Sequence, residues 1–175
     1  MNAAVVLSTA DLRAVTAFAA GSAETVLGIF EADQPDDSRP RAAIDAAWVF
    51  ARGGERGRAL RDTAWAALKA ARSAHTAAGR EAARAAMAAA GAAYLHPLAK
   101  ATQVKHILGA GAHAARAAEL VAGELAADHL ERTARRATPL VVDVLSRYPA
   151  APDGGGRVGE LTRLLDTTLS NRRPA

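Results

Sequence analysis

Residues 80–95 read REAARAAMAAAGAAYL, a stretch of almost pure alanine with its arginines on one side. Alanine has the highest helix propensity of the amino acids and a very small side chain. The stretch therefore predicts a helix that packs tightly against its neighbours. His96-Pro97 follows directly and predicts the end of this helix, because proline disfavours helical geometry in the residue before it.

Alanine dominates the whole chain, with 48 of 175 residues, whereas aromatic residues make up only 4%. Because alanine buries little area, at about 25 cal/mol per Å² of apolar surface, larger side chains must supply most of the burial. We expect that role for the following residues: Leu27, Phe30, Trp48, Phe50, Trp65, Leu68, Tyr94 and Ile107. A partner-facing position is the alternative for either tryptophan, since tryptophan is enriched at binding hot spots.

Apolar residues recur at three- and four-residue steps along the chain, which predicts helices and no strand. Ser8 or Thr9 is expected to cap the first helix, Gly21-Ser22 to weaken it, and Gly79 to cap or kink the third. The predicted helices are 8–32, 40–52, 55–78, 80–95, 98–121, 123–136, 139–148 and 157–170, with a loop at 149–156. The sequence thus predicts an all-α bundle or array of about seven to eight helices, forming a single domain over 1–175.

Composition excludes several classes of function. The chain has no cysteine, so it can hold neither a disulfide nor a thiolate metal site. Its formal charge is +4 and its pI about 10.1, but no Lys/Arg cluster is interleaved with aromatics, so we expect no nucleic-acid partner. No apolar run approaches a membrane span, and the start of the chain does not resemble a secretory signal. We expect a cytoplasmic protein.

The segment 30–45, FEADQPDDSRPRAAID, has the highest density of charge, with both signs mixed. One interpretation is a structural corner, in which Asp37 or Ser38 caps the next helix and an arginine forks onto Glu31 or Asp36. The other is a functional site built from the same charges. Paired carboxylates in acid–base catalysis need pKa values separated by burial. This turn is very hydrophilic, so we have little reason to expect such a separation in it.

The histidines are the other candidates for chemistry. His106 and His113 are seven residues apart, roughly 10 Å along a helix axis, which is too far to bind one metal ion. His75, His96 and His106 lie on different predicted helices or helix ends, so the fold could bring them together. Motifs for nucleophilic serine, phosphate and dinucleotide binding are missing from the sequence. We therefore expect no cofactor and no metal.

Residues 30–48, FEADQPDDSRPRAAIDAAW, resemble the signature of the Imm5-like immunity proteins, small helical bacterial proteins associated with polymorphic toxin systems. Two further segments are similar to helices of that family: AARSAHTAAGR at 70–80 and HILGAGAHAARAA at 106–118. The resemblance covers about residues 8–125. It implies a family core over that range and a C-terminal helical extension over 126–175.

The resemblance implies neutralisation of a cognate toxin by binding, without catalytic residues. If the family shares a pocket, its expected members are Glu31, Asp37, Arg39, Arg41, His75 and His106. Two alternatives stay open. One is a small helical enzyme or metal protein that uses the charged turn 31–41 and the histidines at 75, 96 and 106. The other is a helical scaffold or homo-oligomer, because alanine-rich faces allow close self-packing.

Overall fold

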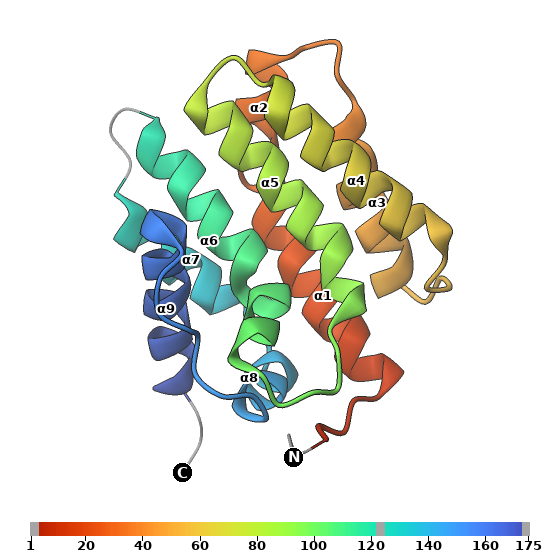
Figure 1. The fold of residues 1–175 in the computed structure, drawn as a ribbon, viewed down its shortest axis with the longest axis vertical. Helices are drawn as coiled ribbons and strands as arrows, with labels where there is room; N and C mark the ends of the chain where they lie inside the picture. Colours follow the sequence, from red (N-terminus) through yellow and green to blue (C-terminus); the bar gives the residue numbers. More distant parts are fainter. Residues whose placement is uncertain (1–3, 122–124, 173–175) are drawn as a thin grey trace.

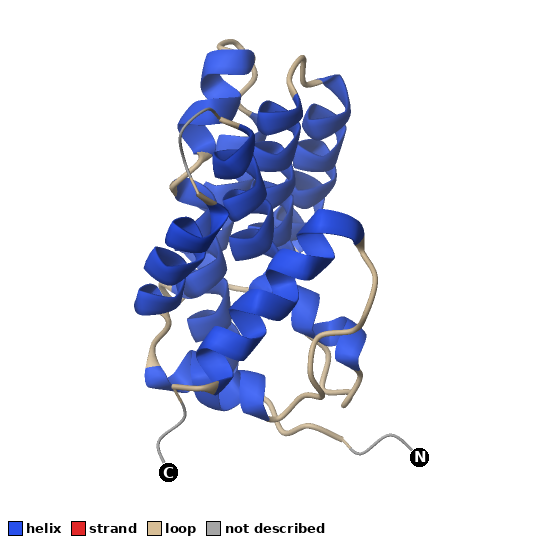
Figure 2. Cartoon of the chain, turned by 90° about the vertical axis from the view of Figure 1, so that its left-hand side faces the viewer, coloured by secondary structure: helices blue, strands red, loops and turns tan. Residues whose placement is uncertain are grey.

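The computed structural model describes residues 4–121 and 125–172, and within these ranges every regular element is helical (Figures 1 and 2). An isolated bridge between Ala4 and Leu98 is the only β-type pairing in the described ranges. The α-helices are α1 (Thr9–Glu24), α2 (Leu27–Asp33), α3 (Arg39–Ala51), α4 (Arg58–Ser73), α5 (Ala77–Gly91), α6 (Val104–Leu120), α7 (Ala126–Arg136), α8 (Pro139–Ser146) and α9 (Gly156–Ser170). Two short 3-10 helices, η1 (Ala92–Tyr94) and η2 (Ala101–Gln103), lie between α5 and α6.

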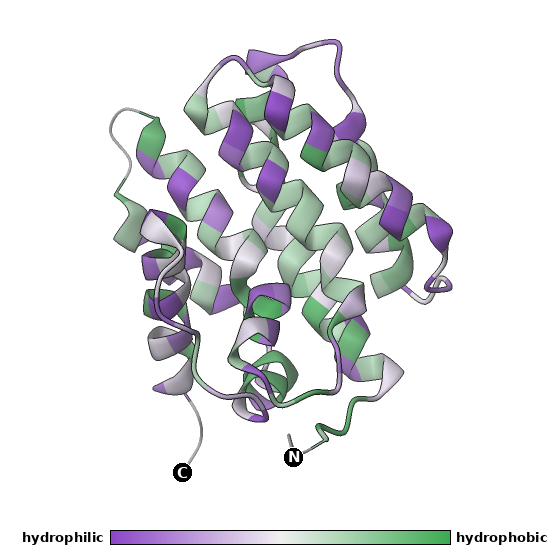
Figure 3. Ribbon diagram, in the orientation of Figure 1, coloured by the Kyte–Doolittle hydropathy of each residue, from purple (hydrophilic) through white to green (hydrophobic). Residues whose placement is uncertain are grey.

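The helices pack as two rows. α5 lies between α4 and α6, and α9 packs on the far side of α6 (Figure 1). Behind this row, α1 packs against α3, α5 and α6. Hydrophobic residues, drawn in green, predominate along α5 in Figure 3, as expected for a helix with neighbours on several sides.

Alanines from α5 and α6 line the core, and its large side chains come from α6 and from the surrounding helices. The largest fully buried side chains include Phe30, Ile44, Ile107, Leu108, Leu145 and Leu161. Of the residues expected to fill the core, Leu27 and Phe50 are also buried, whereas Trp48, Leu68 and Tyr94 are half-buried. The prediction was wrong for Trp65, whose exposed fraction is 60%.

The predicted first helix is two helices, and its break is not at Gly21. α1 begins at an N-cap on Ser8, as expected, with Asp11 completing a capping box. It ends at Glu24, and α2 starts at Leu27 after Val26 leaves helical geometry. The Thr25 hydroxyl donates to the Ser22 carbonyl oxygen at 2.6 Å. Hydroxyl groups that bond back to the preceding turn bend helices, which explains a break that glycine alone did not cause.

The boundary between the third and fourth predicted helices was also misplaced. α4 ends at Ser73, and the Thr76 hydroxyl caps α5 by accepting from the Gly79 N–H at 2.9 Å. Gly79 therefore lies in the first turn of α5 rather than at the end of α4. The sixth predicted helix, 123–136, begins at Ala126 in the structure, and its first two residues lie outside the described ranges.

The C-terminal helices are attached to the main body by buried leucines and by ion pairs. Leu161, Leu165 and Leu169 of α9 are fully buried in the same core as α6. Arg157 of α9 donates to Glu119 of α6 at 2.5 Å. Hydrogen bonds from Arg157, together with those from Arg116, lower the pKa of Glu119 to about 2 against the opposing effect of burial. At the other end of the molecule, Arg147, which directly follows α8, contacts the buried Asp11 at 2.8 Å.

None of the helices in the described ranges combines the length and the apolar character that crossing a bilayer requires.

Candidate functional site

The charged corner comprises residues 31–41, from the end of α2 through the turn to the start of α3. The Arg39 guanidinium forks onto the Asp37 carboxylate, with its Nη2 2.6 Å from Oδ2 and its Nε 2.9 Å from Oδ1. The same carboxylate accepts from the Arg39 backbone N–H at 3.1 Å. These hydrogen bonds from Arg39 lower the pKa of Asp37. Arg41 reaches back along the chain and contacts Glu31 at 2.5 Å.

Asp33, which was not among the predicted site residues, joins this corner to the turn between α4 and α5. Its two carboxylate oxygens accept from the backbone N–H groups of His75 and Thr76, each at 2.8 Å. Burial acts to raise the pKa of Asp33, but the hydrogen bonds from these two residues outweigh it, and the pKa is lowered. A Cβ at Gly79 would lie 2.8 Å from the Asp33 Cγ, so only glycine leaves room for this contact.

The turn between α4 and α5 receives two further contacts from the corner. The Gln34 side chain donates to the Ser73 carbonyl oxygen at 3.1 Å, and Arg39 donates to the Ser73 hydroxyl at 3.2 Å. Together with Asp33, these bonds tie two sequence-distant turns to each other. The geometry matches the structural-corner interpretation, because Glu31, Asp33 and Asp37 are all engaged by arginines or by backbone N–H groups.

The predicted site residues do not all come together. Glu31, Asp37, Arg39 and Arg41 lie in the charged corner, and His75 lies in the adjoining turn, just before the start of α5. His106 instead contacts Gly91 at the other end of α5. A helix of that length separates its ends by roughly 20 Å.

The three histidines proposed as a metal or enzyme site do not come together as one set. His96 is exposed, and its backbone N–H donates to the Gln103 side chain at 3.0 Å. His75 lies at the opposite end of α5 from His106, so these three residues form no cluster. Within 4–121 and 125–172, the structure shows no group of three or more His, Cys, Asp or Glu side chains that could hold a metal ion.

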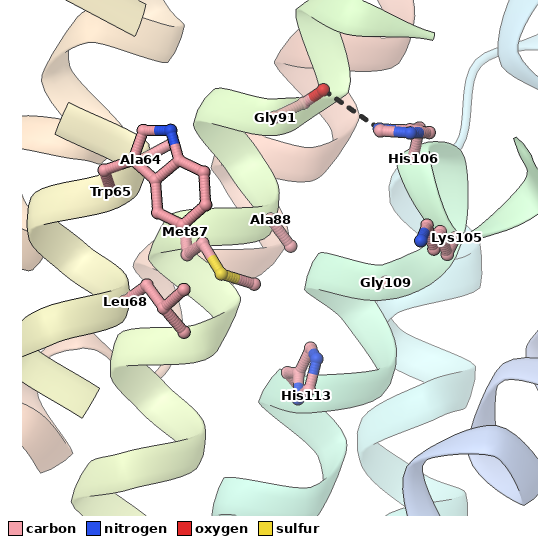
Figure 4. A pocket seen from close by; sticks show the side chains of 10 residues that line it. All are labelled: Ala64, Trp65, Leu68, Met87, Ala88, Gly91, Lys105, His106, Gly109 and His113. Atoms are coloured by element: carbon pink, nitrogen blue, oxygen red, sulfur yellow. Dashed lines mark hydrogen bonds between the residues drawn. The ribbon is translucent and has the colours of Figure 1, made fainter. Parts of the chain in front are cut away.

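A surface groove between α4, α5 and α6 is the main hollow near the helical histidines (Figure 4). Its volume is about 470 Å³, and its lining is mostly apolar. We call it the α4–α6 groove and define it by the side chains of Trp65, Leu68, Met87, Lys105, His106 and His113. Figure 4 shows Trp65 and Leu68 on one wall, with Lys105, His106 and His113 on the other.

The electrostatics of the groove come from its α6 wall. The Nδ1 of His106 lies 3.1 Å from the Gly91 carbonyl oxygen, which can only accept, so this nitrogen carries the proton. Burial lowers the pKa of His106, and the charge of Lys105 acts in the same direction. His106 is thus neutral near pH 7. His113 donates from Nδ1 to Glu81 at 2.6 Å, and Glu81 also accepts from Arg84 at 2.8 Å.

Sequence reasoning found His106 but missed the groove, because the groove depends on where Trp65 lies. The buried face of α4 consists of Leu60, Ala67, Ala70 and Ala71. Trp65 is on α4 but off this stripe, and the helical spacing of the stripe was the signal that could have placed it outside the core. The α4–α6 groove can therefore bind a ligand by burying its apolar surface beside the positive charge of Lys105.

The chain was compared with the models of known protein families. The family model described as "Imm-5 like putative immunity protein" matches residues 6–139. The match extends past residue 125, where the resemblance noted in the sequence ends, and includes α7. Searches of curated proteins and of solved structures found no match.

Proposed function

We propose that this chain, which belongs to the Imm5-like family of immunity proteins, binds a cognate toxin and neutralises it without catalysing a reaction. The observation that carries the proposal is the family match over residues 6–139, which includes all of α1 to α7. An immunity protein acts by forming a stable complex, so the property that matters is a surface complementary to the toxin. We place this action in the cytoplasm.

The way in which the charged residues are used supports a role in binding. A general acid or base needs a group that is free to exchange a proton with a substrate. In the charged corner, Asp37 is occupied by Arg39, and Glu31 is occupied by Arg41. These contacts rigidify the surface, and a rigid surface loses less entropy on binding.

The proposal is tested by co-expression with toxin domains encoded next to this gene. We expect the chain to restore growth of cells that express one of them, and to form a complex of defined stoichiometry with it, measured by light scattering after gel filtration. Failure to protect against every neighbouring toxin, together with the absence of a complex, would remove the proposal. A chain that only associates with itself would instead support the scaffold alternative.

The binding role predicted for the charged corner can be tested in the same assay. Arg41 is more than half exposed, and its contact with Glu31 lies within the corner itself, so Arg41→Glu changes the charge of this surface with little effect on the core. If the corner contacts the toxin, the variant should bind more weakly and remain folded. Unchanged affinity would assign the corner a structural role only.

A further inference from the structure

We propose that the α4–α6 groove is the surface that holds the toxin, and that it takes an aromatic or aliphatic side chain from an acidic segment of that toxin. The inference rests on the proposed function and adds to it a location and a partner chemistry.

Trp65 is the largest exposed apolar side chain in the described ranges, with an exposed fraction of 60%. Leu68 lies close to it on α4, and Met87 on the neighbouring α5 lines the same groove. Tryptophan in such a position is typical of a binding hot spot, because covering it removes a large apolar area from water. A flexible methionine beside it can adapt to the side chain that enters.

The groove is open because its floor consists of small residues. Ala88 and Gly91 of α5 and Gly109 of α6 lie between the two walls. Larger side chains at these positions would fill the space between Trp65 and His106. The volume of about 470 Å³ lies within the range of surface sites that bind small ligands, and it can accommodate a large side chain with its flanking backbone.

The charge around the groove favours an acidic partner. The three helices that form it, α4, α5 and α6, carry eight Lys and Arg residues against three Asp and Glu residues. This excess is larger than the net charge of +4 for the whole chain, so the remaining helices and loops contribute no net positive charge. Of these basic residues, Lys105 lines the groove itself. A carboxylate that enters the groove is therefore attracted to this charge.

The acids on these three helices are already engaged within the chain. Asp62 pairs with Arg58, Glu81 with Arg84, and Glu119 with Arg116. Lys105, which lines the groove, is exposed and forms no ion pair with the residues that the structure describes. A carboxylate from the toxin next to the bound apolar side chain would provide its partner. Since the groove is a single hollow with one exposed aromatic, it matches a protein side chain better than a run of stacked bases.

The first experiment uses peptides and does not require the toxin to be known. The probe is a short synthetic peptide with one phenylalanine flanked by aspartate and glutamate, and the matched control replaces those acids by lysine. In ¹H–¹⁵N spectra we expect the acidic peptide to shift the Trp65 indole signal in a saturable manner at millimolar concentration or below. The Trp48 indole N–H is buried without a hydrogen-bond partner, so its signal is an internal reference and should not move.

Three results of the peptide experiment would overturn the inference. These are the absence of any shift at Trp65, an equal response to the lysine peptide, and a stronger response at Trp65 to a single-stranded oligonucleotide. The first would show that the groove binds no apolar side chain, and the second that charge does not contribute. The third would point to nucleic acid in place of a protein.

The second experiment uses the toxin against which the wild-type chain protects. We expect Trp65→Ala and Lys105→Glu each to weaken the complex at least about tenfold. The matched controls are Leu164→Ala, which removes an exposed apolar side chain on α9, and Lys100→Glu, which makes the same charge change outside the groove lining. Both controls should bind like the wild type.

The two proposals fail in different ways in this experiment. If the wild-type chain protects and both groove variants bind and protect equally well, the groove assignment is wrong and the immunity function stands. If the wild-type chain neither binds nor protects, the immunity function is wrong, and the toxin-docking assignment of the groove falls with it.

Discussion

At the scale of single residues, small side chains decide how closely the helices approach. Gly109 and Gly111 lie on the same helix, α6, but have different surroundings. A Cβ at Gly109 would meet only the Ala88 Cβ at 3.8 Å, which is an ordinary contact. A Cβ at Gly111 would lie 3.0 Å from both the Leu165 Cδ2 and the Thr133 Cγ2. One glycine borders the open groove, and the other permits the contact of α6 with α7 and α9.

These two glycines provide a matched pair of substitutions. We expect Gly109→Ala to raise the free energy of unfolding by up to about 1 kcal/mol, because alanine is the better helix former. Gly111→Ala has the same propensity gain but overpacks the interface at a cost of about 1–3 kcal/mol, so it should be less stable than Gly109→Ala. Urea denaturation measures both. Equal stability of the two variants would contradict the close approach at Gly111.

His106 should make stability depend on pH. Burial is the main reason that its pKa in the folded state is below the ordinary value of 6.5. As the pH falls through 6.5, the unfolded chain binds a proton at His106 more readily than the folded chain does. The stability that neutral His106 contributes at higher pH is therefore lost. We expect His106→Gln to lose less stability than the wild type between about pH 7 and pH 5. Identical losses in denaturation at the two pH values would show that His106 is not responsible.

At the scale of elements, a side chain that accepts from backbone N–H groups connects two turns that are distant in the sequence. Asp33 ends α2 and accepts from the N–H groups of His75 and Thr76 before α5. The sequence predicted a polar turn within residues 31–41, and it also showed the short polar stretch that contains His75. Their contact was not visible, because nothing in either segment specifies the other as its neighbour.

We expect Asp33→Ala to lower the free energy of unfolding by about 1–3 kcal/mol, since it removes the acceptor of two backbone donors. The matched control is Asp36→Ala in the same turn, where the exposed side chain should tolerate the change within about 0.5 kcal/mol. Chemical denaturation of both variants measures the difference. Equal effects of the two substitutions would mean that the contact between the turns does not contribute to stability.

At the scale of the whole molecule, the C-terminal helices contribute to the core. The sequence suggested a family core over 8–125 and an extension over 126–175, and the family match ends at residue 139. However, Leu161, Leu165 and Leu169 of α9 are fully buried in the same core as α6. Burial of three leucines is worth roughly 5–9 kcal/mol in total, which is comparable to the entire stability of a typical domain.

We therefore expect a chain truncated after Thr138, which lacks α8 and α9, to be unfolded or aggregated. Exposure of the α6 surface beneath α9 is the physical reason. Circular dichroism and gel filtration of the truncated chain test this expectation. A cooperative, monomeric truncated protein would show that the C-terminal helices are dispensable.

The sequence by itself determined the helical class, most helix positions and the family, because these depend on local propensity, on spacing along one helix and on a contiguous motif. Only the tertiary structure decided that Asp33 connects two turns, that His75 and His106 lie at opposite ends of α5, and that Trp65 lines an open groove. In a chain so rich in alanine, many helix faces are similarly apolar and small. The pattern therefore specifies that helices form, whereas the choice of packing partners depends on the few large side chains and on the glycines that let them fit.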